Sequence, residues 1–409
     1  MKVQPTPTSP KVRKMKDIEN LYNDKGLREI HKPARRNGKV FTIVLAIIIG
    51  IFSGFFGGLF FYYFFDDSNS VNEDLPIQIS RQSQIQPEKL EDLSEKYQQT
   101  LVGIYQEKTD VSSTNPIAGL YYPWEQLTTG LIVTSDGWIV VPKWSMTDLS
   151  QDYLAVTSDG DTHPIEKIMA DPALPVYYLK IEDANLSVIK FANLDDTTVG
   201  EEIFVMHRNA ELKMVVLSSF LAQKNYLEKT KTADYIESSD VYSLKYLIKD
   251  SLAQDTQGAI AVNTKGEIIG LVCSDGWPTN QIIPANQIDT GLTSLLKNSE
   301  IVRPKLGIHY IDLSQTVNMS ILFSQGKESG ALIHGDREIN RPAIISNSIA
   351  ETAGLLKGDI IKKVDNVSLD RNTPFSDLLL AYDSGEEISL EVLREGKTIT
   401  VELKLDINK

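Results

Sequence analysis

Short apolar runs separated by turn signals fill the chain between residues 101 and 283. Most runs have fewer than about eight residues, which suits strands and is too short for most globular helices. Turn triplets such as Ser135-Asp136-Gly137 stand between them. Many short strands without long helices predict barrels or sandwiches, and about twelve strands would complete two six-stranded β-barrels. The expected strands are 101–105, 130–134, 138–141, 153–157, 176–181, 188–191, 202–206, 214–220, 244–248, 259–262, 268–273 and 281–283.

The stretch from Lys249 to Cys273 is the most informative part of this pattern. It predicts a sharp loop around Thr256 and Gly258, followed by two short apolar strands that flank a Lys-Gly turn. Apolar strands on both sides of a glycine turn are typical of a β-hairpin.

Length and composition predict two folded domains with appendages. A chain of 409 residues is too long for one small core, and its 42% hydrophobic and 23% charged residues are ordinary for a globular protein. The expected divisions are a basic cytoplasmic tail (1–39), a transmembrane helix (40–65), a linker (66–89), a double β-barrel domain (90–300) and a C-terminal α+β domain (301–409).

Charge is distributed unevenly along the chain. Residues 1–39 carry 11 Lys and Arg against 4 Asp and Glu, whereas the whole chain has a net charge of −14, so the remainder carries −21. An acidic exterior argues against nucleic acid as a partner.

Residues 40–65 contain no charged side chain over 26 positions, a length that spans about 30 Å of hydrocarbon. A cluster of Lys32, Arg35, Arg36 and Lys39 precedes them, which predicts a cytoplasmic N-terminus by the positive-inside rule. The run is long for a signal peptide and lacks a small-residue cleavage pattern. We therefore expect a single-pass anchor, with everything after Phe65 outside the cytoplasm.

Glycines recur every four residues on one face of this segment, at Gly50, Gly54 and Gly58. Such a stripe allows two anchors to pack closely. Glycine is also common in membrane helices generally, and the sequence leaves both explanations open.

Metal and disulfide chemistry is not indicated by the sequence. Cys273 is the single cysteine and lies in an apolar strand, which predicts a buried thiol without a disulfide partner. The five histidines show no ligand spacing, so we expect no metal site and no cofactor.

Three segments of the barrel region resemble one protein family. Residues 129–141 (TGLIVTSDGWIVV), 171–181 (DPALPVYYLKI) and 281–286 (QIIPAN) resemble segments of the HtrA/DegP family of serine proteases. In that family the first segment leads into the catalytic histidine and the second carries the aspartate. The resemblance implies a trypsin-like double β-barrel domain and an extracytoplasmic location.

The catalytic positions do not carry the family's catalytic residues. The resemblance places Trp144 where the general base belongs, Pro175 at the aspartate position and Thr256 at the nucleophile position, with Gln254 at the glycine of the oxyanion loop. A hydroxyl needs an adjacent base that a third group orients. An indole N–H can only donate a hydrogen bond, and proline has no side-chain acceptor. We therefore expect no intact catalytic triad.

Other residues offer weak substitutes. Lys143 should point away from the Trp144 direction, because neighbouring strand residues face opposite sides, and His207 lies at a strand end. Both are expected to be solvated surface residues. Ser251 is the least implausible alternative nucleophile, and Asp171 is expected to act as a turn former outside the triad.

Residues 301–409 resemble the PDZ domain appended to HtrA proteases. The resemblance implies that the backbone N–H groups of Leu306, Gly307 and Ile308 bind the carboxylate of a peptide C-terminus. Arg303 and Lys305 either favour that carboxylate or are plain surface charges. A predicted helix carries Phe375, Leu378, Leu379 and Tyr382 on one face, so Phe375 and Leu379 either contact peptide or belong to the core.

Three functions follow from these expectations. The favoured one is a membrane-anchored, proteolytically inactive protease homologue that acts as a peptide-binding or scaffold protein in protein quality control. The second is an active serine-type endopeptidase with a rearranged catalytic site. The third is a structural subunit that associates with an active protease, or a homo-oligomer, as the resemblance to trimeric relatives allows.

Overall fold

A computed structural model describes part of the chain, namely residues 50, 53, 87–108, 117, 119–194, 197–209, 211, 213–227, 229–253, 256–273 and 279–405. The expected transmembrane helix lies outside these residues except for Gly50 and Ser53, as does the basic tail. Among the helices in the described ranges, none is long and apolar enough to cross a membrane. The described residues from Pro87 onward belong to one compact unit.

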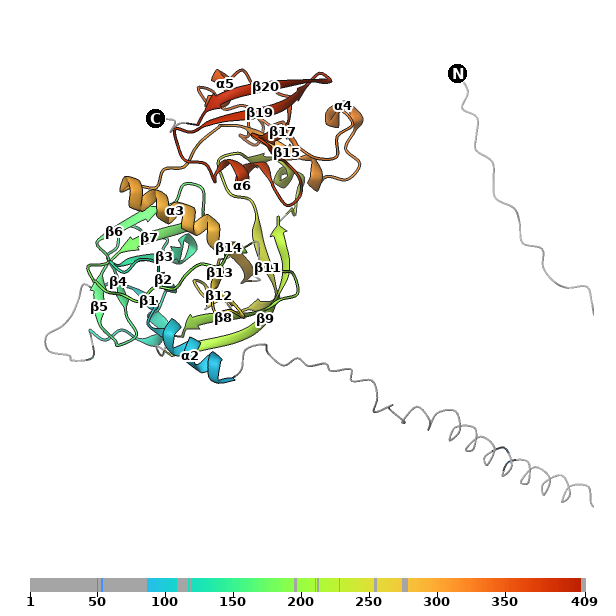
Figure 1. The fold of residues 1–409 in the computed structure, drawn as a ribbon. Coiled ribbons are helices and arrows are strands. Elements are labelled where there is room, and N and C mark those ends of the chain that lie inside the picture. The colour runs from blue at the N-terminus through green and yellow to red at the C-terminus, as the bar shows by residue number, and fades with distance from the viewer. Residues whose placement is uncertain are drawn as a thin grey trace, which may run out of the picture. The chain divides into compact units, whose positions relative to one another are not determined.

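The first part of the folded region is an antiparallel sheet in the order β5-β4-β1-β2-β3-β7-β6 (Figure 1). Its strands are β1 (Leu101–Gln106), β2 (Thr128–Ile132), β3 (Trp138–Pro142), β4 (Tyr153–Val156), β5 (Thr162–Pro164), β6 (Lys167–Ala170) and β7 (Val176–Lys180). The expected six-stranded barrel is wrong in its number of strands, because this sheet has seven. The apolar pattern does not predict β5 and β6, since their residues are exposed or only partly buried.

The second part is a closed barrel in the order β11-β14-β13-β12-β8-β9, which confirms six strands there. Its strands are β8 (Glu202–Arg208), β9 (Met214–Tyr226), β11 (Lys245–Leu252), β12 (Ile260–Asn263), β13 (Ile268–Val272) and β14 (Thr279–Pro284). The expected strand at 188–191 is not formed. Phe191 makes a single bridge to Ile268, and Val188 is 44% exposed, so this apolar run is not a barrel strand.

Helices α2 (Pro87–Gln98) and α3 (Ala285–Asn298) pack against the core that is shared by the first sheet and the closed barrel. Helix α2 agrees with the amphipathic pattern, and its Leu93 contacts the main core. Helix α3 follows β14 and is not among the expected elements. It buries Ile288, Leu292 and Leu295 against the same core, at the spacing of one helix face.

The C-terminal part is a second sheet in the order β10-β15-β16-β17-β19-β20, with β18 paired to β17. Its strands are β10 (Glu237–Ser238), β15 (His309–Asp312), β16 (Ala331–Ile333), β17 (Ile360–Val364), β18 (Val367–Ser368), β19 (Glu387–Arg394) and β20 (Lys397–Lys404). Its helices are α4 (Ile321–Ser324), α5 (Ile349–Thr352) and α6 (Phe375–Leu379). The expected α+β fold is therefore formed, but its edge strand β10 comes from the barrel region of the sequence.

Candidate functional site

The residues expected at the base and aspartate positions, Trp144 and Pro175, lie beside the ends of two paired strands. Trp144 sits in the short helix η3 (Lys143–Ser145) directly after β3 and is 49% exposed. Pro175 directly precedes β7, which pairs with β3. The Lys143 N–H donates to the carbonyl of Pro175 at 2.9 Å. The two positions thus lie close together, and they offer an indole and a pyrrolidine ring.

Thr256 lies in a tight loop before β12 and is 1% exposed. Its hydroxyl donates to the carbonyl of Ala253 at 2.6 Å. The loop rests on β2, since the carbonyl of Gln257 accepts from the hydroxyl of Thr128 at 2.8 Å. The hydroxyl proton of Thr256 is therefore directed at a carbonyl that cannot act as a base.

Gly258 allows this close approach of the loop to β2. Its φ is +79°, and a Cβ there would lie 1.9 Å from the carbonyl oxygen of Thr129. Only glycine combines that backbone conformation with the required space. Gln254, the expected oxyanion-loop position, lies outside the described residues.

Cys273 connects the hairpin to the aspartate-equivalent position. Its thiol is buried and lies 3.8 Å from the carbonyl oxygen of Pro175, which agrees with the expected buried cysteine. A backbone path runs from Thr256 through Ala259 and Val272 toward Cys273. The loop with Thr256 and the strand end with Pro175 therefore lie in one region, where the closed barrel meets the first sheet.

The alternative residues are placed differently from the expectation. His207 is 3% exposed, so the solvated surface position is wrong for it. The β8–β12 register pairs Met206 with Ile260, which brings His207 to the end of β12 that follows the Thr256 loop. Lys143 is partly buried, and its ammonium donates to the carbonyl of Asp171 at 2.6 Å. Ser251 is exposed on β11.

Burial lowers the pKa of Lys143. Its hydrogen bond to a backbone carbonyl and its position over the Tyr177 ring, 5.7 Å from the centroid, keep it within the first sheet. This geometry gives no support to a Ser/Lys-type or Thr/Lys-type pair with Thr256.

Asp171 and Arg303 form a buried ion pair. Asp171 accepts from the N–H groups of Ala173 and Leu174 at 2.8 and 3.2 Å, as expected of a turn former. It also pairs with Arg303 at 2.6 Å, and neither side chain is more than 2% exposed. Both explanations expected for Arg303, binding of a peptide carboxylate and a plain surface charge, are therefore wrong. Lys305 remains partly exposed beside the loop.

The expected carboxylate-binding loop is well formed and occupied. Leu306 and Gly307 donate their N–H groups to one carboxylate oxygen of Asp240, both at 3.1 Å. Ile308 donates to the hydroxyl of Ser239 at 3.1 Å. The loop therefore binds a carboxylate in this structure, and that carboxylate belongs to the same chain.

Phe375 and Leu379 are buried in the core of the C-terminal domain, at 1% and 0% exposure. The ring of Phe375 packs edge-on against Tyr310 with a centroid separation of 5.5 Å. The core explanation therefore describes both side chains in this structure. Between them, burial raises the pKa of Asp377 to about 7, and this carboxyl group accepts from the amide of Gln287 at 3.1 Å.

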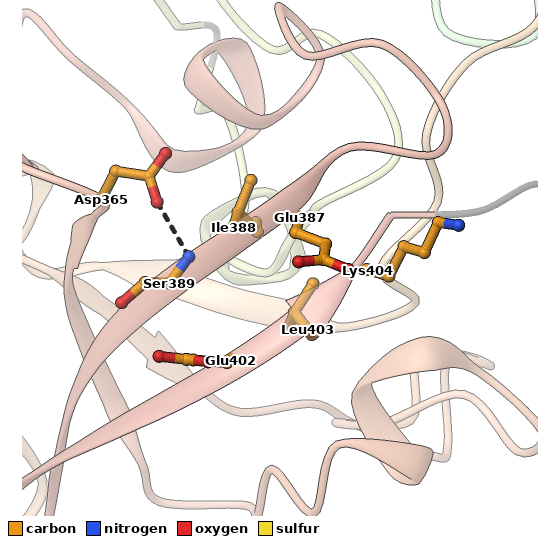
Figure 2. Close-up of a pocket in the computed structure, with 7 residues that line it drawn as sticks. All are labelled: Asp365, Glu387, Ile388, Ser389, Glu402, Leu403 and Lys404. Carbon is orange, nitrogen blue, oxygen red and sulfur yellow. Dashed lines mark hydrogen bonds between the residues drawn. The ribbon is translucent and has the colours of Figure 1, made fainter.

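A depression of about 390 Å³ lies elsewhere on the C-terminal domain (Figure 2). It is lined by Asp365, Glu387, Ile388, Ser389, Glu402, Leu403 and Lys404. Its walls are the β19–β20 hairpin and the turn after β17, so it is separate from the loop at 306–308. Three carboxylates and one ammonium stand beside only two aliphatic side chains, whereas ligand pockets are usually lined mostly by apolar groups.

Fold and site together define a mainly β, trypsin-like body that is followed by a PDZ domain. Residues 304–405 match the family model described as PDZ domain. A solved structure described as HtrA-type protease AlgW with decapeptide has the same fold, with a TM-score of 0.58 and 14% identity over 78% of this chain and 98% of that one.

Two curated relatives have similar sequences. The probable periplasmic serine endoprotease DegP-like of Chlamydia pneumoniae is 24% identical over 286 residues, which cover 67% of this chain and 53% of that protein. The serine protease Do-like HtrB of Bacillus subtilis is 22% identical over 331 residues, which cover 77% of this chain and 70% of that protein. The match to the first relative thus spans about half of its length. The resemblance to HtrA/DegP-type serine proteases with a PDZ domain is supported.

Proposed function

We propose that this chain is a membrane-anchored, extracytoplasmic HtrA-like protein without proteolytic activity, which binds peptide or protein C-termini and acts as a scaffold in protein quality control. One observation is the main support for the proposed lack of proteolytic activity. The hydroxyl of Thr256 donates to a backbone carbonyl, while Trp144 and Pro175 stand at the base and aspartate positions. A hydroxyl without a positioned base is a poor nucleophile at neutral pH.

Location and partners rest on the sequence and on the relatives. The charge-free segment 40–65 and the basic cluster before it favour a single-pass anchor with a cytoplasmic N-terminus. One relative is named as periplasmic, which supports an extracytoplasmic location. The PDZ domain supports peptide binding. Association with an active protease or with further copies of the chain is part of the proposal, and a nucleic-acid partner is not.

An active endopeptidase is the second candidate, and one observation favours it. His207 is buried near the end of β12 that follows the Thr256 loop, so a rearranged site would use this imidazole as its base.

The full chain, purified in detergent, should not cleave casein. We expect product formation to be the same in the native chain and in Thr256→Ala, because the Thr256 hydroxyl donates to a backbone carbonyl rather than to a base. The measurement is fluorescence release from labelled casein over several hours. Turnover that disappears in Thr256→Ala and also in His207→Ala would establish the second candidate instead.

A further inference from the structure

The edge of β15 and the loop at 306–308 are the two surfaces that a PDZ domain would offer to a peptide end. An extended peptide adds a strand to the sheet edge, and its terminal carboxylate binds to the loop N–H groups. In this structure both surfaces are already used. Strand β10 pairs with β15 in antiparallel register, with Glu237 opposite Tyr310 and Ser238 opposite His309.

The chain continues from β10 into the loop as a peptide terminus would. The N–H of Ser239 donates to the carbonyl of Ile308 at 3.0 Å, which extends the strand pairing by one residue. Next along the chain, Asp240 presents its side-chain carboxylate to the N–H groups of Leu306 and Gly307. A side-chain carboxylate thus stands where the terminal carboxylate of a ligand would bind.

Side chains on both sides hold this segment in place. The hydroxyl of Tyr310 donates to Glu237 at 3.1 Å, and Arg341 donates to the carbonyls of Ala233 and Ile236 at 2.6 and 2.7 Å. Beyond the segment, the hydroxyl of Tyr242 donates to the carbonyl of Leu380 at 3.1 Å. The chain is therefore held by hydrogen bonds before, within and after β10.

We propose that Glu237–Asp240 is a built-in ligand of the PDZ domain, which keeps the carboxylate-binding loop closed until a peptide C-terminus displaces it. The inference rests on the proposed function, because it concerns the same peptide groove. A tethered ligand acts at a high effective concentration, on the order of millimolar for short flexible linkers. A free peptide binds only those molecules in which the segment has dissociated from the groove. Its apparent dissociation constant therefore equals the intrinsic constant divided by the fraction of open molecules.

Hydrogen exchange of the full chain in detergent tests whether the segment closes the loop. In Asp240→Ala we expect the amides of 306–308 to exchange roughly tenfold faster or more, because two charge-assisted hydrogen bonds are lost. Asp240→Asn keeps one acceptor oxygen and should give a smaller increase. Asp250→Ala is the matched control, since Asp250 is exposed on β11 and its carboxylate accepts from Ser219, away from the loop.

Displacement is tested with a fluorescent peptide that copies residues 235–239, Tyr-Ile-Glu-Ser-Ser, with a free C-terminal carboxylate. We expect at least about tenfold tighter binding to Asp240→Ala than to the native chain and to Asp250→Ala. The same peptide with a C-terminal amide should not show this gain. Equal affinity of the free-acid peptide for all three chains, or loop amides that exchange equally fast in the native chain and in Asp240→Ala, would overturn the inference.

The experiments distinguish failure of this inference from failure of the proposed function. Casein turnover by the native chain would overturn the proposed function and leave a closed groove standing. Rapid exchange at 306–308 in a native chain that is inert toward casein would overturn the built-in ligand alone.

Discussion

Replacing Asp171 with alanine should lower the free energy of unfolding by about 3–5 kcal/mol, because it leaves a charged Arg303 buried without its partner. The side chain of Arg303 is 2% exposed and has its carboxylate partner at 2.6 Å. The substitution also removes the acceptor for the N–H groups of Ala173 and Leu174. Urea unfolding followed by tryptophan fluorescence measures the change.

The double variant Asp171→Ala with Arg303→Met is the control for this prediction. Removing both charges replaces the ion pair with apolar atoms, which is often nearly neutral, so the double variant should be more stable than Asp171→Ala alone. The turn around Asp171 would still lose its acceptor, at about 1 kcal/mol. A double variant that is less stable than Asp171→Ala would show that the buried charge is not the main cost.

Gly258→Ala should be the second severe substitution, with a loss of about 2–5 kcal/mol in the free energy of unfolding. The left-handed conformation alone costs about 1–2 kcal/mol for a residue with a Cβ. The new methyl group would also meet the carbonyl oxygen of Thr129 at 1.9 Å, and overpacking costs about 1–3 kcal/mol more. The midpoint of thermal unfolding is the measurement.

Gly160→Ala separates these two causes. Gly160 also has a positive φ, +92°, but a Cβ there has no atom within 4 Å. We therefore expect Gly160→Ala to lose only the conformational part, about 1–2 kcal/mol. If both substitutions lowered the free energy of unfolding equally, the contact between the new methyl group and β2 would contribute nothing to the cost of Gly258→Ala.

Strands β12 and β13 of the closed barrel could be predicted from sequence because they are buried and mostly apolar. In β12 and β13 every residue is buried, so each appears as an apolar run between turn residues. Strands β5 and β6 carry little apolar signal, because they lie at the two edges of their sheet. The run at 188–191 was predicted as a strand because it is largely apolar, but it does not form a strand in the structure.

Helix α3 is absent from the expected elements although the sequence carries a signal for it. Ile288, Leu292 and Leu295 follow the spacing of one helix face. The barrel strand β14 ends at Pro284, directly before the helix begins. The hydrophobic pattern therefore changes from that of a strand to that of a helix without a loop in between. A window across this junction shows neither pattern clearly.

The sequence predicted individual elements of the candidate site, but it did not predict the long-range contacts between them. The resemblance to a PDZ domain predicts a loop with N–H donors at 306–308, but nothing local links this loop to Asp240, which is 66 residues away from Leu306. The pairing of Asp171 with Arg303 spans 132 residues. Such contacts depend on how folded elements pack, and a single sequence does not encode them in any local period.

Covalent labelling of Thr256 tests the central claim most directly. The full chain in detergent is incubated with a fluorophosphonate, which reacts with an activated serine or threonine hydroxyl, and adducts are mapped by mass spectrometry of its peptides. We predict no adduct on Thr256 under conditions that label trypsin completely. Its hydroxyl donates to the carbonyl of Ala253, and we propose that Trp144 occupies the position of the general base. An adduct on Thr256 that is lost in His207→Ala would contradict the claim.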